Sequence, residues 1–176
     1  MLDIDQPVGR WKTQSNFTIV TSQDNKQQWR EYPAPDKIAF LMSQWLARLN
    51  SSLATIHQQD MAATIYADLQ LSFVTIHPFF DGNGRLARLL ANLPVLKSRF
   101  PPIVVPQEDR YRYKLCLSDY QNTVENLAEL RDLVQLPANA EKQRFIELCK
   151  GYWSETLELL ENAKAMQRKR NLSLDQ

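Results

Sequence analysis

The fold is organised around one stretch of sequence, IHPFFDGNGRLAR at residues 76–88. Pro78 disfavours helical backbone in the residue before it, so a helix that reaches this stretch is expected to end at His77. The loop that follows holds Gly82 and Gly84, two of the four glycines in the chain, which indicates a local need for unusual backbone. A second helix is expected to start at about Gly84. The stretch therefore predicts a helix, a tight polar loop and another helix.

Apolar residues recur at three- and four-residue steps on both sides of this junction, as in amphipathic helices. The pattern predicts helices that open at Pro33 and Pro35 and then run over about 60–77, 84–99, 107–121, 123–134 and 141–168. Residues 16–32 differ, because β-branched residues, a turn-like segment and a second extended run follow one another there. We therefore predict an all-α fold, a helical bundle with one appended β-hairpin.

Size and composition limit the class of protein. A length of 176 residues suits a single domain over residues 1–176. The net charge of +1 gives no electrostatic reason to expect nucleic acid or an acidic membrane as partner. No apolar run approaches the ~20 residues that span a bilayer, and the polar start MLDIDQPVGR does not look like a signal peptide. Cys116 and Cys149 are far apart and are expected to be buried thiols. We expect a cytoplasmic protein.

The loop at residues 81–88 has the composition of a phosphate site. Gly82, Asn83 and Gly84 supply adjacent backbone N–H groups at a helix N-terminus, where unpaired amides and the helix dipole favour an anion. Arg85 and Arg88 are three residues apart and so share one helix face. Because each arginine offers two parallel donors to a phosphate, the pair suits a di- or triphosphate.

Two further residues of this stretch can take part in chemistry. Asp81 fits beside an anion if Mg²⁺ bridges its carboxylate and the phosphates. His77 has the side chain whose ordinary pKa best suits proton abstraction near neutral pH. Each feature alone also has a structural interpretation, as a core histidine, a turn or solvated arginines. Their coincidence within twelve residues predicts a site that handles phosphate.

The same stretch resembles the signature of the Fic family, HPFx[DE]GNGRxxR, at every specified position from His77 to Arg88. The resemblance extends to GRWK at residues 9–12, although Lys12 stands where an arginine is common. The predicted hairpin is similar to the flap of the family, and FPPIVVP at residues 100–106 with Arg110 and Tyr113 resembles its next helix. The resemblance covers about residues 7–125; the helices at about 126–170 match only in character.

This resemblance implies transfer of AMP from ATP to a Ser, Thr or Tyr hydroxyl of a target protein, with release of pyrophosphate. It implies His77 as general base and Asp81 as ligand of Mg²⁺ on the α- and β-phosphates. It gives the anion hole to Gly82, Asn83 and Gly84, and it assigns the β-phosphate to Arg85, the γ-phosphate to Arg88 and a further nucleotide contact to Tyr113. Gln121 stands where the family often has asparagine, so we assign it no role.

The resemblance also gives the hairpin a use. In the family the flap edge pairs with an extended segment of the target and aligns its hydroxyl group, a form of strand addition. The residues expected to line nucleotide and target are Ile19, Val20, Thr21 and Ser22.

Many family members carry an inhibitory [ST]xxxE[GN] helix whose glutamate pairs with the residue equivalent to Arg88. Ser154 and Glu158 have the right spacing, but Leu159 follows them, so a helix-surface glutamate is expected. Fewer than ten residues precede Gly9, which leaves too little chain for an N-terminal inhibitory helix. Either a separate antitoxin-like protein supplies the glutamate, or this chain is a core cut from a longer protein. Oligomer formation is compatible with both.

Other functions are compatible with this fold. The chain could transfer another phosphate-linked group, such as UMP or phosphocholine, or remove AMP, or bind a nucleotide and partners without catalysis. The unaltered Gly82 speaks against changed transfer chemistry, and the intact His77 speaks against a pure binding module.

Overall fold

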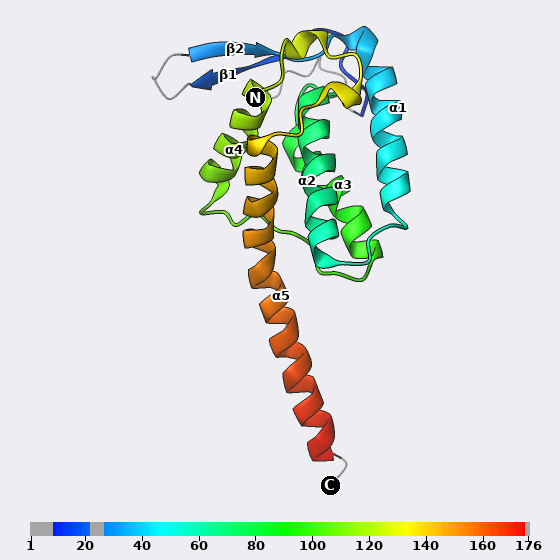
Figure 1. Cartoon of the computed structure of the whole chain (residues 1–176), viewed down its shortest axis with the longest axis vertical. Coiled ribbons are helices and arrows are strands. Elements are labelled where there is room, and N and C mark those ends of the chain that lie inside the picture. Colours follow the sequence, from blue (N-terminus) through cyan, green and yellow to red (C-terminus); the bar gives the residue numbers. More distant parts are fainter. Residues whose placement is uncertain (1–8, 22–26, 175–176) are drawn as a thin grey trace.

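A computed structural model describes residues 9–21 and 27–174 of the chain (Figure 1). It contains the predicted helical bundle and hairpin, so the fold-class prediction is confirmed. The described helices are α1 (Pro35–Ser52), α2 (Gln59–Ile76), α3 (Asn83–Lys97), α4 (Arg110–Asn122) and α5 (Ala140–Leu174). The strands are β1 (Phe17–Thr21) and β2 (Gln27–Glu31), and two short 3₁₀ helices are η1 (Leu127–Glu129) and η2 (Leu133–Gln135).

The α2 helix is the centre of the bundle and packs against α1, α3 and α5. Every residue from Leu69 to Ile76 is buried, so this end of the helix is enclosed on all sides rather than along one stripe. The indole of Trp45 in α1 donates a hydrogen bond of 2.9 Å to the carbonyl oxygen of Leu69. The end of α2 that carries His77 is therefore rigidly fixed inside the core.

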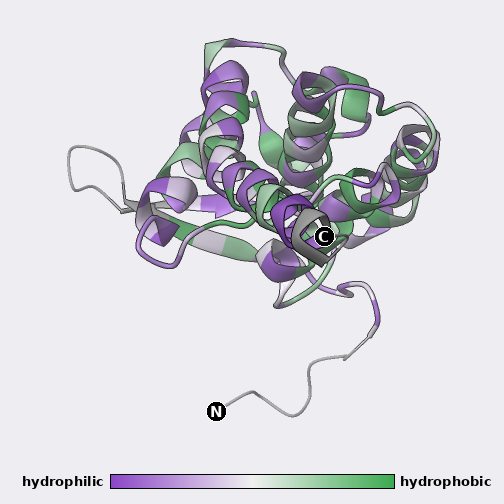
Figure 2. Cartoon of the chain, turned by 90° about the horizontal axis from the view of Figure 1, so that it is seen from below, coloured by the Kyte–Doolittle hydropathy of each residue, from purple (hydrophilic) through white to green (hydrophobic). Residues whose placement is uncertain are grey.

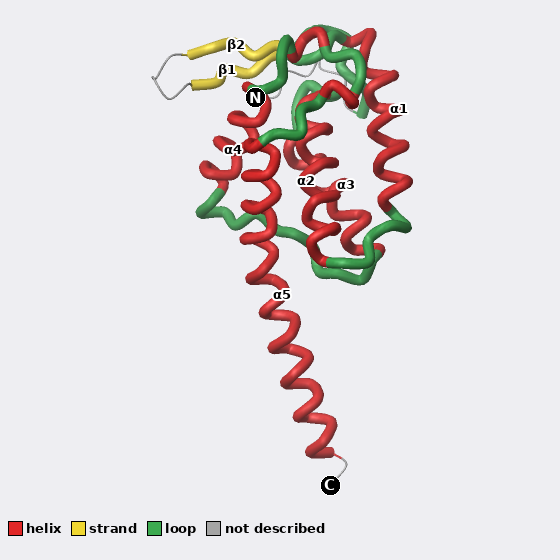
Figure 3. The backbone as a smooth tube through the Cα atoms, in the orientation of Figure 1, coloured by secondary structure: helices red, strands yellow, loops and turns green. Residues whose placement is uncertain are grey.

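The hairpin lies across one end of the bundle, beside α4 (Figure 3). β1 and β2 are antiparallel, with Phe17 opposite Glu31 and Thr21 opposite Gln27. Arg30 of β2 attaches the hairpin to α4, because its guanidinium donates to Gln121 Oε1 at 2.8 Å and to the carbonyl and hydroxyl oxygens of Ser118, both at 3.1 Å. A two-stranded hairpin is marginal alone in water. Its contact with α4 supplies the missing support.

The prediction of a helix at about 123–134 is wrong. The segment forms η1 and η2 instead, because local side chains compete with helical hydrogen bonding. Asn126 adopts a left-handed φ of 45°, which no continuous right-handed helix allows. Asp132 accepts a hydrogen bond of 2.8 Å from the Val134 amide, while Gln135 Oε1 accepts one of 3.1 Å from the Asp132 amide.

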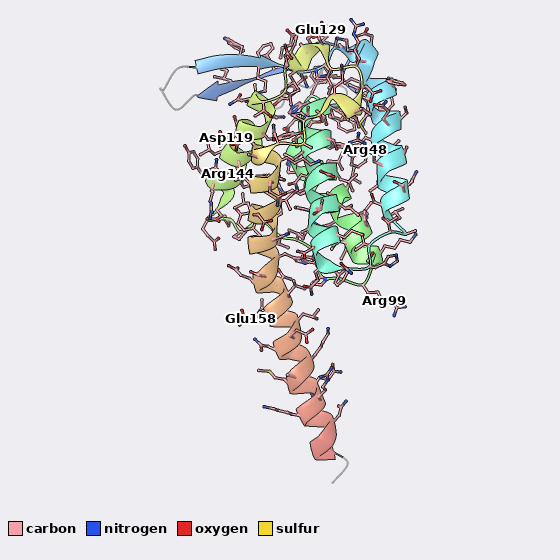
Figure 4. The ribbon with its side chains drawn as sticks, viewed as in Figure 1. Arg48, Arg99, Asp119, Glu129, Arg144 and Glu158 are labelled. Atoms are coloured by element: carbon pink, nitrogen blue, oxygen red, sulfur yellow. The ribbon has the colours of Figure 1, made fainter. Side chains whose placement is uncertain are left out.

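The α5 helix has two parts with different surroundings. Its first half packs on α2 and α4 and contributes buried residues as far as Trp153. Arg144 of this half lies 3.4 Å from Asp119 of α4 (Figure 4). From residue 161 to residue 171 every side chain is exposed, and this part projects away from the bundle (Figure 1). Most residues of this part are hydrophilic (Figure 2).

Two predictions from composition can be compared with the described chain. Cys116 and Cys149 are free and buried, as predicted. None of the described helices combines the length and the apolar character that crossing a bilayer requires.

Candidate active site

The loop after α2 is closed by the side chain of Asn83. Its Oδ1 accepts a hydrogen bond of 2.9 Å from the Phe79 amide, and its Nδ2 donates one of 2.6 Å to the Phe79 carbonyl. Asn83 is only 2% exposed, so this side chain is a structural part of the loop. Sequence reasoning assigned Asn83 a place in the anion hole; its backbone amide remains free for that role, whereas its side chain does not.

Backbone conformation directs both ends of the loop. His77 has a left-handed φ of 51°, and its amide still donates to the Phe73 carbonyl at 3.0 Å. Gly82 has a φ of 82°, a region that glycine enters without steric cost. These two residues reverse the chain between α2 and α3, which places the imidazole beside the N-terminus of α3.

The first amides of α3 are available to an anion. The first bond of the helix runs from the Leu86 amide to the Gly82 carbonyl, at 2.9 Å. No side chain of the described residues caps this helix, so the amides of Asn83, Gly84 and Arg85 have no acceptor there. Together with the helix dipole they form an anion-binding end.

The segment before β1 supports the loop from outside. The Lys12 amide donates to the Pro78 carbonyl at 2.8 Å. Asn16 Nδ2 donates to the Phe79 carbonyl at 3.0 Å and, more weakly, to the His77 carbonyl at 3.5 Å. Three carbonyl groups of the loop region are thus held by residues that lie more than sixty positions earlier in the chain.

His77 is oriented as a proton acceptor. Its Nδ1 lies 3.2 Å from the Val74 carbonyl oxygen, and because a carbonyl only accepts, Nδ1 carries the hydrogen and Nε2 has the free lone pair. The pKa of His77 is lowered to about 4, mainly by burial; the hydrogen bond to the Val74 carbonyl opposes this shift, Lys12 adds to it and Asp81 opposes it. The imidazole is therefore neutral at physiological pH.

A cavity of about 410 Å³ joins these parts, a volume in the usual range of small-molecule sites. Its lining comes from the loop and the start of α3, from residues 16–18 at the start of the hairpin, and from Arg110 and Lys114 of α4. His77, Asp81, Gly82, Asn83, Gly84, Arg85 and Arg88 all line it. The structure thus brings together every residue that was predicted from the loop.

The cavity is strongly cationic. Arg85 forms an exposed pair with Asp81 at 2.9 Å, and the guanidinium of Arg88 lies over the Tyr113 ring at 5.5 Å. Within the described chain, Arg88, Arg110 and Lys114 have no carboxylate within ion-pair distance. Sequence reasoning assigned no role to Arg110 and missed Lys114. Their spacing of one helical turn was visible, but nothing in the sequence shows that α4 faces the loop.

Other predicted residues lie away from the cavity lining. Tyr113 is 1% exposed and sits beneath Arg88 against Phe145, where burial raises the pKa of its hydroxyl. Its contact with a nucleotide stays a prediction, as do the contacts of Ile19, which is exposed on β1. Val20 and Thr21 belong to β1, and Ser22 lies outside the described residues. Glu158 is exposed on α5 and does not line the cavity (Figure 4).

The side chains that line the cavity fit a metal ion that is bound by one carboxylate and by phosphate oxygens. Asp81 is the only carboxylate among the described residues that line the cavity. Nowhere in the described residues do three or more His, Cys, Asp or Glu side chains gather as a metal cluster. A single carboxylate suits Mg²⁺ that takes its other ligands from phosphate oxygens and water.

Comparison with known proteins agrees with this geometry. The model of the Fic/DOC family matches residues 3–95, more than half of the chain. The "Protein adenylyltransferase Fic" of Drosophila erecta is 39% identical over 82 residues, which are 46% of this chain and 16% of that protein. The protein of the same name from Drosophila persimilis is 40% identical over 82 residues and is covered to 15%. The match therefore spans about a sixth of the length of these relatives.

Solved structures share the fold. A Fic domain containing signaling protein from Bacteroides thetaiotaomicron superposes with a TM-score of 0.68 at 24% identity, over 89% of this chain and 55% of that one. A Fic family protein from Desulfovibrio desulfuricans gives a TM-score of 0.56 at 18% identity, over 90% of this chain and 44% of that one. With the match of the family model and the shared helical fold, the chain belongs to the Fic/DOC family.

Proposed function

We propose that this chain transfers AMP from ATP to a Ser, Thr or Tyr hydroxyl of a protein. The observation that carries the proposal is the position of the neutral His77 imidazole on a cationic cavity that also contains the open N-terminus of α3. A base beside a polyphosphate site is what attack of a hydroxyl on phosphorus requires. The curated relatives that share 39–40% identity with this segment are named as adenylyltransferases, which supports the same chemistry.

The proposed reaction uses the residues in fixed roles. Nε2 of His77 takes the proton of the target hydroxyl as its oxygen bonds to the α-phosphorus, and the bond to the β-phosphate oxygen breaks, so pyrophosphate leaves. The free amides of α3 receive the negative charge that develops. Arg85 binds the β-phosphate and Arg88 the γ-phosphate. Asp81 would hold Mg²⁺, which when bound offsets the charge of the phosphates.

The hairpin is proposed to dock the target. Among the described strands β1 pairs only with β2, so its other edge can accept an extended segment. Residues 16–18 at the start of β1 already line the cavity. A target strand added along β1 would carry its hydroxyl group past His77, with contacts from residues 19–22.

Regulation by a separate protein is part of the proposal. Arg88 has no carboxylate partner in the described chain, and its guanidinium rests on Tyr113. An antitoxin-like protein that presents a glutamate to Arg88 would neutralise the group assigned to the γ-phosphate and block productive binding.

The proposal is tested with ATP labelled at the α-phosphate, Mg²⁺ and a cell lysate. We expect label on a protein band and on the chain itself, and loss of that label in His77→Ala. His57→Ala is the matched control, because His57 is the other histidine of the chain and is exposed. Labelling that survives in His77→Ala would refute the assigned base. Labelling from UTP but not from ATP would replace AMP transfer by UMP transfer.

A further inference from the structure

Tyr32 packs directly on the imidazole that the proposed reaction uses as base. The two rings are stacked, with centroids 3.8 Å apart and planes inclined by 14°. Tyr32 is 4% exposed and follows β2, and its amide donates to the Asn16 carbonyl at 3.1 Å. Its hydroxyl lies 3.1 Å from Oγ1 of Thr18, which lines the cavity. The plane of His77 is thus fixed by a ring that the hairpin holds at both ends.

Lys12 places a charge next to this stack. Its side chain is 2% exposed, with Nζ 5.9 Å from the centroid of the Tyr32 ring. The ammonium donates to Asn16 Oδ1 at 2.6 Å, and the described chain offers it no carboxylate within ion-pair distance. Burial lowers the pKa of Lys12 to about 8, although Glu31 opposes the shift, so the group is charged at neutral pH.

A buried charge without a carboxylate costs stability. An apolar side chain of similar length would fill the same space without that cost. The charge of Lys12 therefore indicates a role beyond packing. The group that could use this charge is the imidazole of His77, which stacks on the Tyr32 ring.

We propose that Tyr32 and Lys12 are positioning residues for His77: Tyr32 fixes the plane of the imidazole, and Lys12 places a cation beside the ring on which the imidazole stacks. The inference rests on the proposed role of His77 as general base. A base is useful only while it is unprotonated, and a nearby cation opposes protonation. Asp81 acts in the opposite direction, while the cations Arg85, Arg88, Arg110 and Lys114 of α3 and α4 line the same cavity.

The first test is a titration of the imidazoles by NMR, which needs no enzymatic activity. The chain has two histidines, so the exposed His57 is an internal reference for the partly buried His77. We expect His77 to titrate well below the ordinary histidine value of about 6.5, and Lys12→Met to raise the pKa of His77, because the mutation removes a nearby positive charge. Lys97→Met, which removes an exposed charge from α3, should leave the pKa of His77 unchanged.

Lys12→Gln repeats the test with a side chain that can still donate to Asn16, which guards against a variant that fails to fold. An unchanged His77 titration in both Lys12 variants would overturn the role of the charge. Tyr32→Leu should raise the pKa of His77 toward the ordinary histidine value, because the imidazole loses the ring that covers it, whereas Tyr32→Phe should keep the low value. Equal titrations in these two variants would overturn the role of the ring.

The second test separates positioning from binding in the AMP-transfer assay. Tyr32→Leu should lower kcat about 10- to 100-fold and leave the KM for ATP within about twofold, since a displaced base slows the chemical step only. Tyr32→Phe keeps the stack and should lose far less. Tyr111→Leu, at a site 79% exposed on α4, is the matched control. A change in KM alone would contradict positioning. Absence of AMP transfer in the wild type would refute the proposed function, and the NMR titration would still decide the present inference.

Discussion

Gly82 and Gly84 stand two positions apart at the start of α3 and serve different needs. The φ of 82° at Gly82 is strained for any residue with a Cβ. Gly84 has ordinary helical backbone, and a Cβ there would meet Arg88 Nη1 at 3.8 Å, an ordinary contact distance. Backbone geometry therefore explains the glycine at position 82. The glycine at position 84 lines the cavity, and because it has no side chain its amide stays open to a ligand there.

Alanine at these two positions should have opposite effects on stability. Gly84→Ala should raise the free energy of unfolding by about 0.5 kcal/mol, since alanine is the better helix residue, and should weaken ATP binding about tenfold because the methyl group enters the site. Gly82→Ala should lower the free energy of unfolding by about 1 kcal/mol. Urea denaturation and calorimetric titration measure both quantities. Undiminished ATP affinity in Gly84→Ala would show that phosphate does not approach this amide.

The partly buried His77 should make the protein sensitive to acid. Its pKa of about 4 in the folded chain is below the ordinary value of 6.5, so between these values the unfolded chain binds a proton that the folded chain does not. The stability that this group contributes is complete above pH 6.5 and is lost as the pH falls toward 4, by roughly 3 kcal/mol. Urea denaturation between pH 7 and pH 4 should show a flatter pH dependence for His77→Ala. Parallel curves for the two proteins would contradict the low pKa.

At the scale of elements, α4 supplies the part of the cavity lining that comes from neither the loop, nor α3, nor the hairpin. Arg110 and Lys114 are one helical turn apart, line the cavity and have no acidic partner among the described residues. The attachment of Arg30 to Ser118 and Gln121 fixes the other end of the same helix to the hairpin. The α4 helix therefore forms part of the cavity wall and also holds the hairpin.

Removal of one α4 cation should weaken nucleotide binding through charge alone. Lys114→Met is expected to raise the Kd for ATP about three- to tenfold, with the difference from wild type shrinking as salt increases. The matched control is Lys97→Met, which removes an exposed charge of α3 outside the cavity lining. Calorimetric titration at two salt concentrations measures the effect. Equal affinities of the two variants would place Lys114 outside the nucleotide site.

Elements with a strong local signal could be predicted from the sequence. Periodic apolar residues and the prolines located α1, α2 and α3 to within a few residues, and β-branched residues located the hairpin. The segment 123–134 failed because a left-handed Asn126 and the cap at Asp132 outweigh helix propensity there. The loop residues of the site were predictable because they are contiguous. Tyr32, Lys12 and Lys114 were not, since tertiary packing brings them to the loop from distant segments.

At the scale of the whole molecule, the bundle and the projecting part of α5 are energetically separate. Over residues 140–171, the part of α5 whose burial is described, the last buried residue is Trp153, which donates to the Pro101 carbonyl at 2.9 Å and so belongs to the core. Leu157 still packs partly against that core. Every residue from 161 to 171 is exposed, and an isolated helix of this length is marginal in water.

Deletion of residues 162–176 should therefore leave the bundle intact. We expect the Tm to change by less than about 2 °C, because residues 162–171 are exposed and none of them belongs to the described core. In the full chain, amides of residues 162–171 should exchange with deuterium much faster than those of residues 145–153. Thermal unfolding and hydrogen exchange measure these two effects. A large fall in Tm would show that the projection contributes to the core.

The ion pair between Asp81 and Arg85 has a thermodynamic consequence. In the free chain this ion pair competes with both ligands. A divalent cation at Asp81 must displace the Arg85 guanidinium, and a phosphate at Arg85 must displace the Asp81 carboxylate. The ligand that binds first breaks the ion pair, so the second ligand binds more tightly, and this linkage is reciprocal. Because an exposed pair is worth at most about 1 kcal/mol, the cooperativity that it would add between the proposed cation and nucleotide is at most about fivefold in affinity.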